Sequence, residues 1–131
     1  MRKQIILIGV VTGLLGIVLG AFGAHGLQTV LNETAIKSFE TGVRYQMYHA
    51  LFLLFVGIIS NQLPLKKVKK IVRLTVVGLI AFSGSIYVFS LVSMVNTIEI
   101  WPVLRLVTPV GGLCFIAAWL LLGLTSYKSL K

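Results

Sequence analysis

Apolar residues fill four long runs of this chain, and most of the polar residues fall between them. The runs cover residues 4–27, 44–63, 71–95 and 105–124. An α-helix needs about 20 predominantly apolar residues to cross the hydrocarbon core of a bilayer, so each run predicts a membrane-spanning helix. The connections are short, which favours antiparallel neighbours. We therefore expect an all-α fold, an integral membrane four-helix bundle in which residues 1–131 form a single transmembrane domain.

The segment that joins the first two runs has a pattern typical of a short amphipathic helix. Asn32 is a suitable N-cap, and Glu33 stands four residues before Lys37, the spacing of a helical ion pair. Apolar residues recur at helical spacing, at Ile36, Phe39 and Val43. We expect this helix to lie at the membrane interface and to run into the second span.

The charged residues divide between the two sides of this predicted topology. Nine of the twelve basic residues lie at the chain ends and in the middle connection, at Arg2, Lys3, Lys66, Lys67, Lys69, Lys70, Arg73, Lys128 and Lys131. The acidic residues lie in the other two connections, at Glu33, Glu40 and Glu99. Cytoplasmic loops of membrane proteins are rich in Lys and Arg. We therefore expect a multi-pass protein of the cell (cytoplasmic) membrane with both termini in the cytoplasm.

The composition agrees with a membrane protein and argues against nucleic-acid binding. Hydrophobic residues make up 57% of the chain, against about 45–50% in soluble domains. The net charge of +9 comes from basic residues beside apolar runs, where they attract anionic lipid. We expect membrane lipids as partners and no nucleic acid. The expected contacts with anionic inner-leaflet lipid are at Lys66, Lys67, Lys69 and Lys70.

No residue pattern predicts a cofactor. Cys114 is the single cysteine and lies in an apolar run, which excludes an internal disulfide or a cysteine cluster. His25 and His49 would have to hold a metal or haem without further ligands, because no Asp or Glu falls within a span. Ser83 and Ser85 lack the frame of a nucleophile elbow. We expect no metal, no cofactor and no catalytic residue, and an enzyme is the less favoured class.

Glycines in the first run share one helical face. They are Gly9, Gly13, Gly16, Gly20 and Gly23. Two GxxxG pairs occur among them, and such a face lets another helix backbone approach closely in lipid. We expect tight helix packing here, either within the chain or between copies in a homo-oligomer.

Polar residues within the spans gather toward the expected outer side. They are His25, Arg44, Tyr45, Gln46, Tyr48, His49, Ser83, Ser85, Tyr87 and Thr108. Charged groups in a span usually face the bundle interior, so these residues predict a polar pocket open to the outer side. Arg44 suits recognition of a phosphate or carboxylate. The alternative is a structural network, in which Arg44 pairs with Glu40 or Glu99 and the hydroxyls bond to backbone carbonyls.

Four segments give the chain a family resemblance. They read GAFGAHGL at 20–27, TGVRYQMYHA at 41–50, FSGSIY at 82–87 and TPVGG at 108–112. The chain resembles the small bacterial membrane proteins called domain of unknown function 423, or uncharacterised protein family 0382. The resemblance covers essentially the whole chain. It implies a multi-pass cytoplasmic-membrane protein and no particular activity.

Two functions are consistent with these patterns. The first is binding of a lipid headgroup or a small anionic molecule in the outer polar pocket. The alternative is a structural or accessory membrane protein that docks a partner, or its own copy, through the glycine-rich face.

Overall fold

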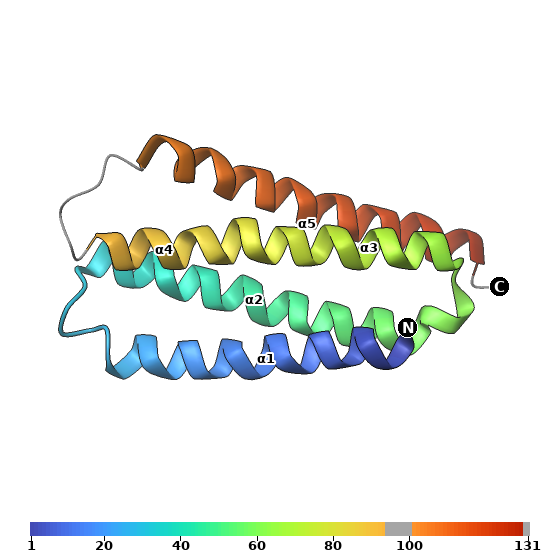
Figure 1. Ribbon diagram of the computed structural model, residues 1–131, viewed down its shortest axis with the longest axis horizontal. Coiled ribbons are helices and arrows are strands. Elements are labelled where there is room, and N and C mark those ends of the chain that lie inside the picture. Colours follow the sequence, from blue (N-terminus) through green and yellow to red (C-terminus); the bar gives the residue numbers. More distant parts are fainter. Residues whose placement is uncertain (94–100, 130–131) are drawn as a thin grey trace.

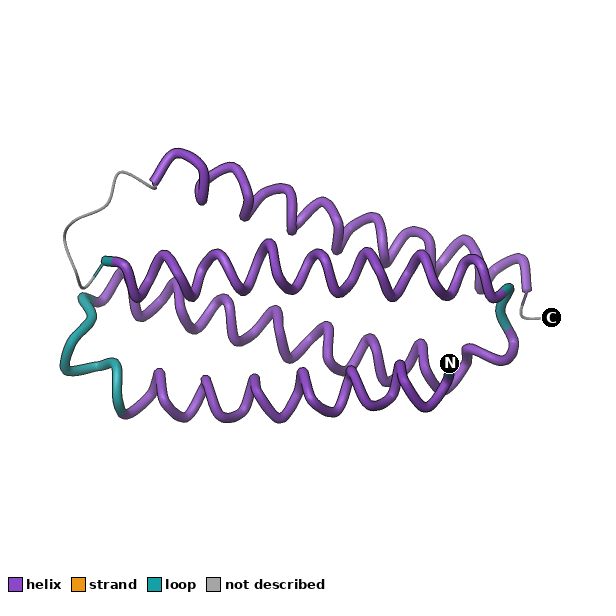
Figure 2. The backbone as a smooth tube through the Cα atoms, viewed as in Figure 1, coloured by secondary structure: helices purple, strands orange, loops and turns teal. Residues whose placement is uncertain are grey.

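Long antiparallel helices make up the fold. A computed structural model describes residues 1–93 and 101–129, with side chains of the last segment from residue 106 onward. Figure 1 shows α1, α2, the α3–α4 segment and α5 running side by side, and Figure 2 shows how little of the described backbone is loop. The start of α1, the end of α5 and the α2–α3 connection lie at the same end of the bundle.

Each predicted span overlaps a long helical segment of the structure. Helix α1 covers Arg2–His25, α2 covers Glu33–Ile59 and α5 covers Trp101–Ser129. After the 3₁₀ turn η1, Ser60–Gln62, the third span consists of α3 (Leu65–Gly78), the π-helix η2 (Leu79–Gly84) and α4 (Ser85–Val92). Four of the described helical segments are long and apolar enough to cross a membrane. The predicted end of the third span at residue 95, Glu99 and the side chain of Arg105 lie outside the described residues.

The second span begins earlier than predicted, at Glu33 rather than at residue 44. The side-chain oxygen of Asn32 accepts a hydrogen bond from the backbone N–H of Ala35 at 2.8 Å, which caps this helix. The expected amphipathic helix forms the first turns of α2 with no break before the span. The expected ion pair between Lys37 and Glu33 is present at 2.7 Å. The location of this segment at the membrane interface, and of both termini in the cytoplasm, stays a prediction.

The glycine face of α1 packs against α2 of the same chain. A Cβ atom placed on these glycines would lie 2.7–3.6 Å from the nearest side-chain atom of α2. From Gly9 to Gly23 the nearest α2 residues are, in order, Leu54, Ala50, Met47, Val43 and Phe39. The descending order is that of an antiparallel pair in register. Gly57 of α2 faces Ile6 of α1 in return.

Helix α5 makes its closest approach to the third span. A Cβ on Gly111 would lie only 2.4 Å from the backbone nitrogen of Phe82, and one on Gly78 would lie 2.6 Å from the ring of Phe115. Backbone at this distance cannot move aside as a flexible side chain can. Glycine at these positions therefore fixes α5 against α3 and η2.

Most of the apolar core lies toward the end of the bundle where the α2–α3 connection is found. Leu53, Val56, Val68 and Ile71 are among its fully buried members, and Ala118 of α5 joins them. A smaller cluster at the other end contains Leu27, Leu31, Ala35 and Phe39. The second cluster holds the α1–α2 connection against the start of α2.

Gly111→Ala should destabilise the protein by about 1–3 kcal/mol, since the new methyl group overpacks against backbone. The neighbouring variant Gly112→Ala is the control, because a Cβ there would make ordinary contacts of 3.8 Å with the Phe82 ring. Thermal unfolding in one detergent would compare the variants. Equal stability of the two would show that α5 and η2 are not in close backbone contact.

Candidate functional site

Gln46 joins three helices at a buried position near the middle of α2. Its Nε2 donates to the backbone oxygen of Thr12 on α1 at 2.9 Å. Its Oε1 accepts from the Tyr87 hydroxyl of α4 at 2.6 Å. The side chain is 7% exposed, so no water or lipid headgroup replaces these partners. Both ends of the amide are therefore used to hold α1, α2 and the third span together.

Serines of the third span add further bonds to α2. Ser83 donates to the backbone oxygen of Gly42 at 2.8 Å, and Ser90 donates to that of Ala35 at 3.3 Å. The missing side chain of Gly42 permits this approach, because a Cβ there would lie 2.8 Å from the Tyr87 ring. Hydroxyls that bond across helices are a common way of joining spans in a membrane.

Ser85 connects the third span to α5 instead. Its hydroxyl lies 2.6 Å from that of Thr108 and also 3.0 Å from the backbone oxygen of Phe82. Ser83 and Ser85 thus bond to helices on opposite sides of the third span. Of the buried side-chain polar atoms in the described residues, none lacks a hydrogen-bond partner.

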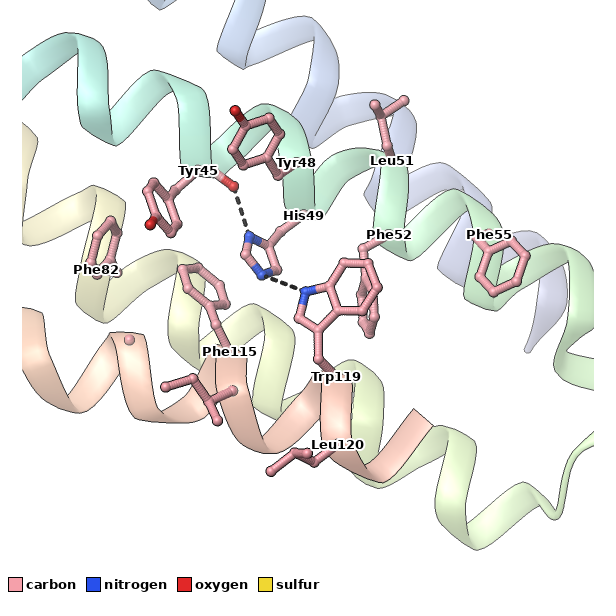
Figure 3. Close-up of a pocket in the computed structure, with 12 residues that line it drawn as sticks. Tyr45, Tyr48, His49, Leu51, Phe52, Phe55, Phe82, Phe115, Trp119 and Leu120 are labelled. Atoms are coloured by element: carbon pink, nitrogen blue, oxygen red, sulfur yellow. Dashed lines mark hydrogen bonds between the residues drawn. The ribbon is translucent and has the colours of Figure 1, made fainter. Parts of the chain in front are cut away.

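Both ring nitrogens of His49 are hydrogen-bonded, Nδ1 within α2 and Nε2 to Trp119 of α5 (Figure 3). Trp119 Nε1 lies 3.3 Å from Nε2, and Nδ1 lies 2.8 Å from the backbone oxygen of Tyr45. The indole N–H can only donate and the carbonyl can only accept. His49 is therefore neutral, with its proton on Nδ1. The Phe115 ring stacks on the imidazole, with centroids 3.5 Å apart.

An apolar groove lies between α2 and α5 around this histidine. Its volume is about 810 Å³. Aromatic rings form most of its wall, with His49 at the centre of Figure 3. The lining residues on α2 are Tyr45, Tyr48, His49, Leu51, Phe52 and Phe55. Those of η2 and α5 are Phe82, Gly112, Phe115, Ile116, Trp119 and Leu120.

The structure distributes the predicted pocket residues over several places. Tyr45, Tyr48 and His49 line the groove. The bonds described above draw the others into contacts between helices, at Gln46, Ser83, Ser85, Tyr87 and Thr108. His25 is exposed at the end of α1 and Arg44 is exposed on α2. The structure therefore does not bring all of these residues into one polar pocket.

Arg44 has no ion pair with Glu40. The described residues contain one ion pair, between Lys37 and Glu33. The other expected partner of Arg44, Glu99, lies outside the described residues. Arg44 is thus an exposed cation on the same helix as the groove wall.

Sequence reasoning missed the α5 side of the groove. Phe115 and Trp119 were read only as part of an apolar run, although they stand four residues apart and share one face. The same spacing joins Tyr48 and Phe52 on α2. Two aromatic stripes on different spans were the available signal, but only packing shows that they face each other. Within the described part of the chain, no three His, Cys, Asp or Glu residues come together.

The helices, their apolar surfaces and the bonds between them define a polytopic helical membrane protein. The family model described as a protein of unknown function, DUF423, matches residues 19–112. The chain belongs to this family. It is 36% identical to a UPF0382 membrane protein of Staphylococcus haemolyticus over 96% of this chain and 97% of that protein.

Other relatives agree across nearly their full lengths. The UPF0382 membrane protein YwdK of Bacillus subtilis is 35% identical, over 98% of this chain and 99% of YwdK. A UPF0382 membrane protein of Haemophilus influenzae is 32% identical, over 98% of both chains. No solved structure matches this chain.

The Gln46–Tyr87 bond is testable by a double-mutant cycle with Gln46→Leu, Tyr87→Phe and the double variant. Each single change leaves a buried partner unsatisfied and should cost about 1–3 kcal/mol. The coupling energy should be about 0.6 kcal/mol and no more than about 1.7 kcal/mol, the average and the largest value for hydrogen bonds between membrane helices. Unfolding free energies in mixed micelles would give the four values. Strictly additive losses would mean that the two side chains do not bond.

Proposed function

We propose that this membrane protein binds a lipid, with one acyl or isoprenoid chain in the groove between α2 and α5. The observation that carries the proposal is the groove itself, about 810 Å³ with an aromatic wall. Its walls are α2, η2 and α5, which belong to helical segments apolar enough to span a membrane. Its opening therefore faces hydrocarbon chains rather than water.

The chemistry of the wall favours an apolar occupant over a small anion. Both nitrogens of His49 are already bonded. The remaining wall presents ring faces and aliphatic side chains, with tyrosine hydroxyls toward one end. Because lipid tails are as apolar as the wall, the selectivity comes from dispersion contacts with preformed aromatic surfaces.

Arg44 is suitably located to bind the lipid headgroup. Arg44, Tyr48, Leu51 and Phe55 follow one another at spacings of four, three and four residues, so they form one stripe along α2. All four are exposed. The stripe is about 16 Å long at 1.5 Å per residue. A lipid lying along it would place a phosphate or carboxylate at Arg44 and its chain beside Phe55. In the expected orientation, the headgroup belongs to the outer leaflet.

The alternative of a docking protein receives less support. The glycine-rich face of α1 was the surface expected to bind a partner or a second copy. It is covered by α2 of the same chain, so it offers no free surface without unpacking α1. Of the residues expected to bind an anion, Arg44 is the one that this proposal keeps for the headgroup, beside the groove that holds the lipid chain.

Filling the groove should remove the bound chain. Ile116→Trp places an indole in the groove, whereas Leu113→Trp places one on a part of α5 that does not line it. Both native residues are exposed. A phospholipid with a photoreactive diazirine in its acyl chain should label Leu51, Phe55 and Ile116 in the wild type. Ile116→Trp should lose most of this labelling on α2, and Leu113→Trp should keep it.

The same labelling experiment can also contradict lipid binding in the groove. Labelling of Leu14 and Ile17, which are exposed on α1, measures contact with bulk lipid. If the groove residues are labelled no more strongly than these, or if both tryptophan variants behave alike, the groove holds no specific lipid.

Arg44→Gln should weaken the preference of the groove for anionic lipid while leaving the chain contacts in place. Loss of one cation near a lipid phosphate is worth about 1 kcal/mol, or a change of about fivefold in relative affinity. Competition of the photoreactive lipid with phosphatidylglycerol and with phosphatidylcholine would measure it. An unchanged ratio would remove Arg44 from the proposed site.

A further inference from the structure

The basic residues of α3 form a row on one face of the helix. Lys66, Lys69, Lys70 and Arg73 stand at relative positions 0, 3, 4 and 7, and all are exposed. The opposite face is buried through Val68, Ile71 and Thr75. Packing therefore fixes the direction of the row, which lies on the outer surface of the bundle.

Two hollows adjoin this row on either side. The first, about 460 Å³, is lined by Lys66, Lys69, Lys70, Arg73, Leu74 and Val77. The second, about 340 Å³, lies between α1 and α3. Lys69, Arg73 and Val77 line both. On the α1 side, Ile5 and Ile8 give the second hollow an apolar wall. The cluster of cations is thus continuous with a crevice between two membrane-spanning helices.

The depth of the row matches that of lipid phosphates. A span needs about 20 residues, and counting back from Val92, where α4 ends, that length is reached at about Arg73. The four cations therefore occupy the first two turns beyond the hydrocarbon core. The two acidic residues that the structure describes, Glu33 and Glu40, lie toward the start of α2, near the opposite end of the bundle. No described carboxylate therefore neutralises the row.

We propose that this row and the α1–α3 crevice form a binding site for an anionic phospholipid of the inner leaflet. The phosphate lies among Lys66, Lys69, Lys70 and Arg73, and one acyl chain lies in the crevice against Ile5 and Ile8. Basic hollows between helices at a membrane surface are suited to anionic headgroups. The apolar crevice distinguishes a lipid from a soluble anion or a nucleic acid. The site is separate from the α2–α5 groove and does not depend on it.

Lys67 provides a matched control. It belongs to the same basic segment and is also exposed, but it lines neither hollow. General attraction of lysines to a negative surface would involve it as much as its neighbours. A specific lipid site formed by the two hollows would not involve Lys67.

The test is native mass spectrometry of the intact protein titrated with phosphatidylglycerol in micelles. Each cation lost should weaken binding about fivefold, so Lys69→Gln/Arg73→Gln should bind about 25-fold more weakly than the wild type. Lys67→Gln should bind as the wild type does. Should the double variant fail to insert, Lys69→Gln/Lys70→Gln replaces it with the same expectation.

Other outcomes would overturn the site. Equal loss in Lys67→Gln would mean diffuse attraction to surface charge, and no loss in the double variant would mean that the row binds no lipid. Competition by millimolar sn-glycerol 3-phosphate would identify a soluble anion as the occupant instead. Arg44→Gln, in the same titration, reports on the groove alone, so failure of one site is distinguishable from failure of the other.

Discussion

A polar group inside a membrane has no water to bond with, and in this protein α2 supplies most of the partners. Backbone oxygens of Ala35 and Gly42 accept bonds from serines of the third span. The Gln46 side chain forms hydrogen bonds with both α1 and α4. Because α2 lies between α1 and the third span (Figure 1), these bonds determine which helices are neighbours. Apolar packing alone would leave that choice open, since lipid tails compete equally for apolar surface.

The same pairing decides what the surface of the bundle can bind. Most of the polar side chains that were expected to form one pocket point toward neighbouring helices and form hydrogen bonds with them. What remains facing the lipid between α2 and α5 is the apolar and aromatic part of those helices. The proposed ligand changes accordingly, from a small anion held by several polar groups to a lipid chain with a single cation, Arg44, at one end of the stripe. The candidate site is apolar because the polar side chains are already hydrogen-bonded between the helices.

The four long apolar helical segments could be predicted from the sequence because hydropathy and segment length are local properties. The glycine face of α1 was also readable, since its spacing places all five residues on one side of a helix. The helix that packs on this glycine face could not be predicted, because such a face can pack against a helix of the same chain or of another copy. The π-helix η2 had no sequence signal, and Gly111 of α5 lies against its backbone at Phe82. Depth along a span was readable for Gln46 and His49. The direction in which each side chain points was not, because it depends on packing angles between spans that are distant in sequence.

The position of the groove follows from where the helices can and cannot come close. Glycines allow α1 to meet α2 and allow α5 to meet α3 and η2, but no such pair joins α2 to α5. Those two helices meet instead through large rings, His49 with Phe115 and Phe52 with Trp119. Bulky side chains hold two helices apart while they connect them, and the space beside them stays open to the membrane. The groove therefore lies at an interface that no close glycine contact brings together.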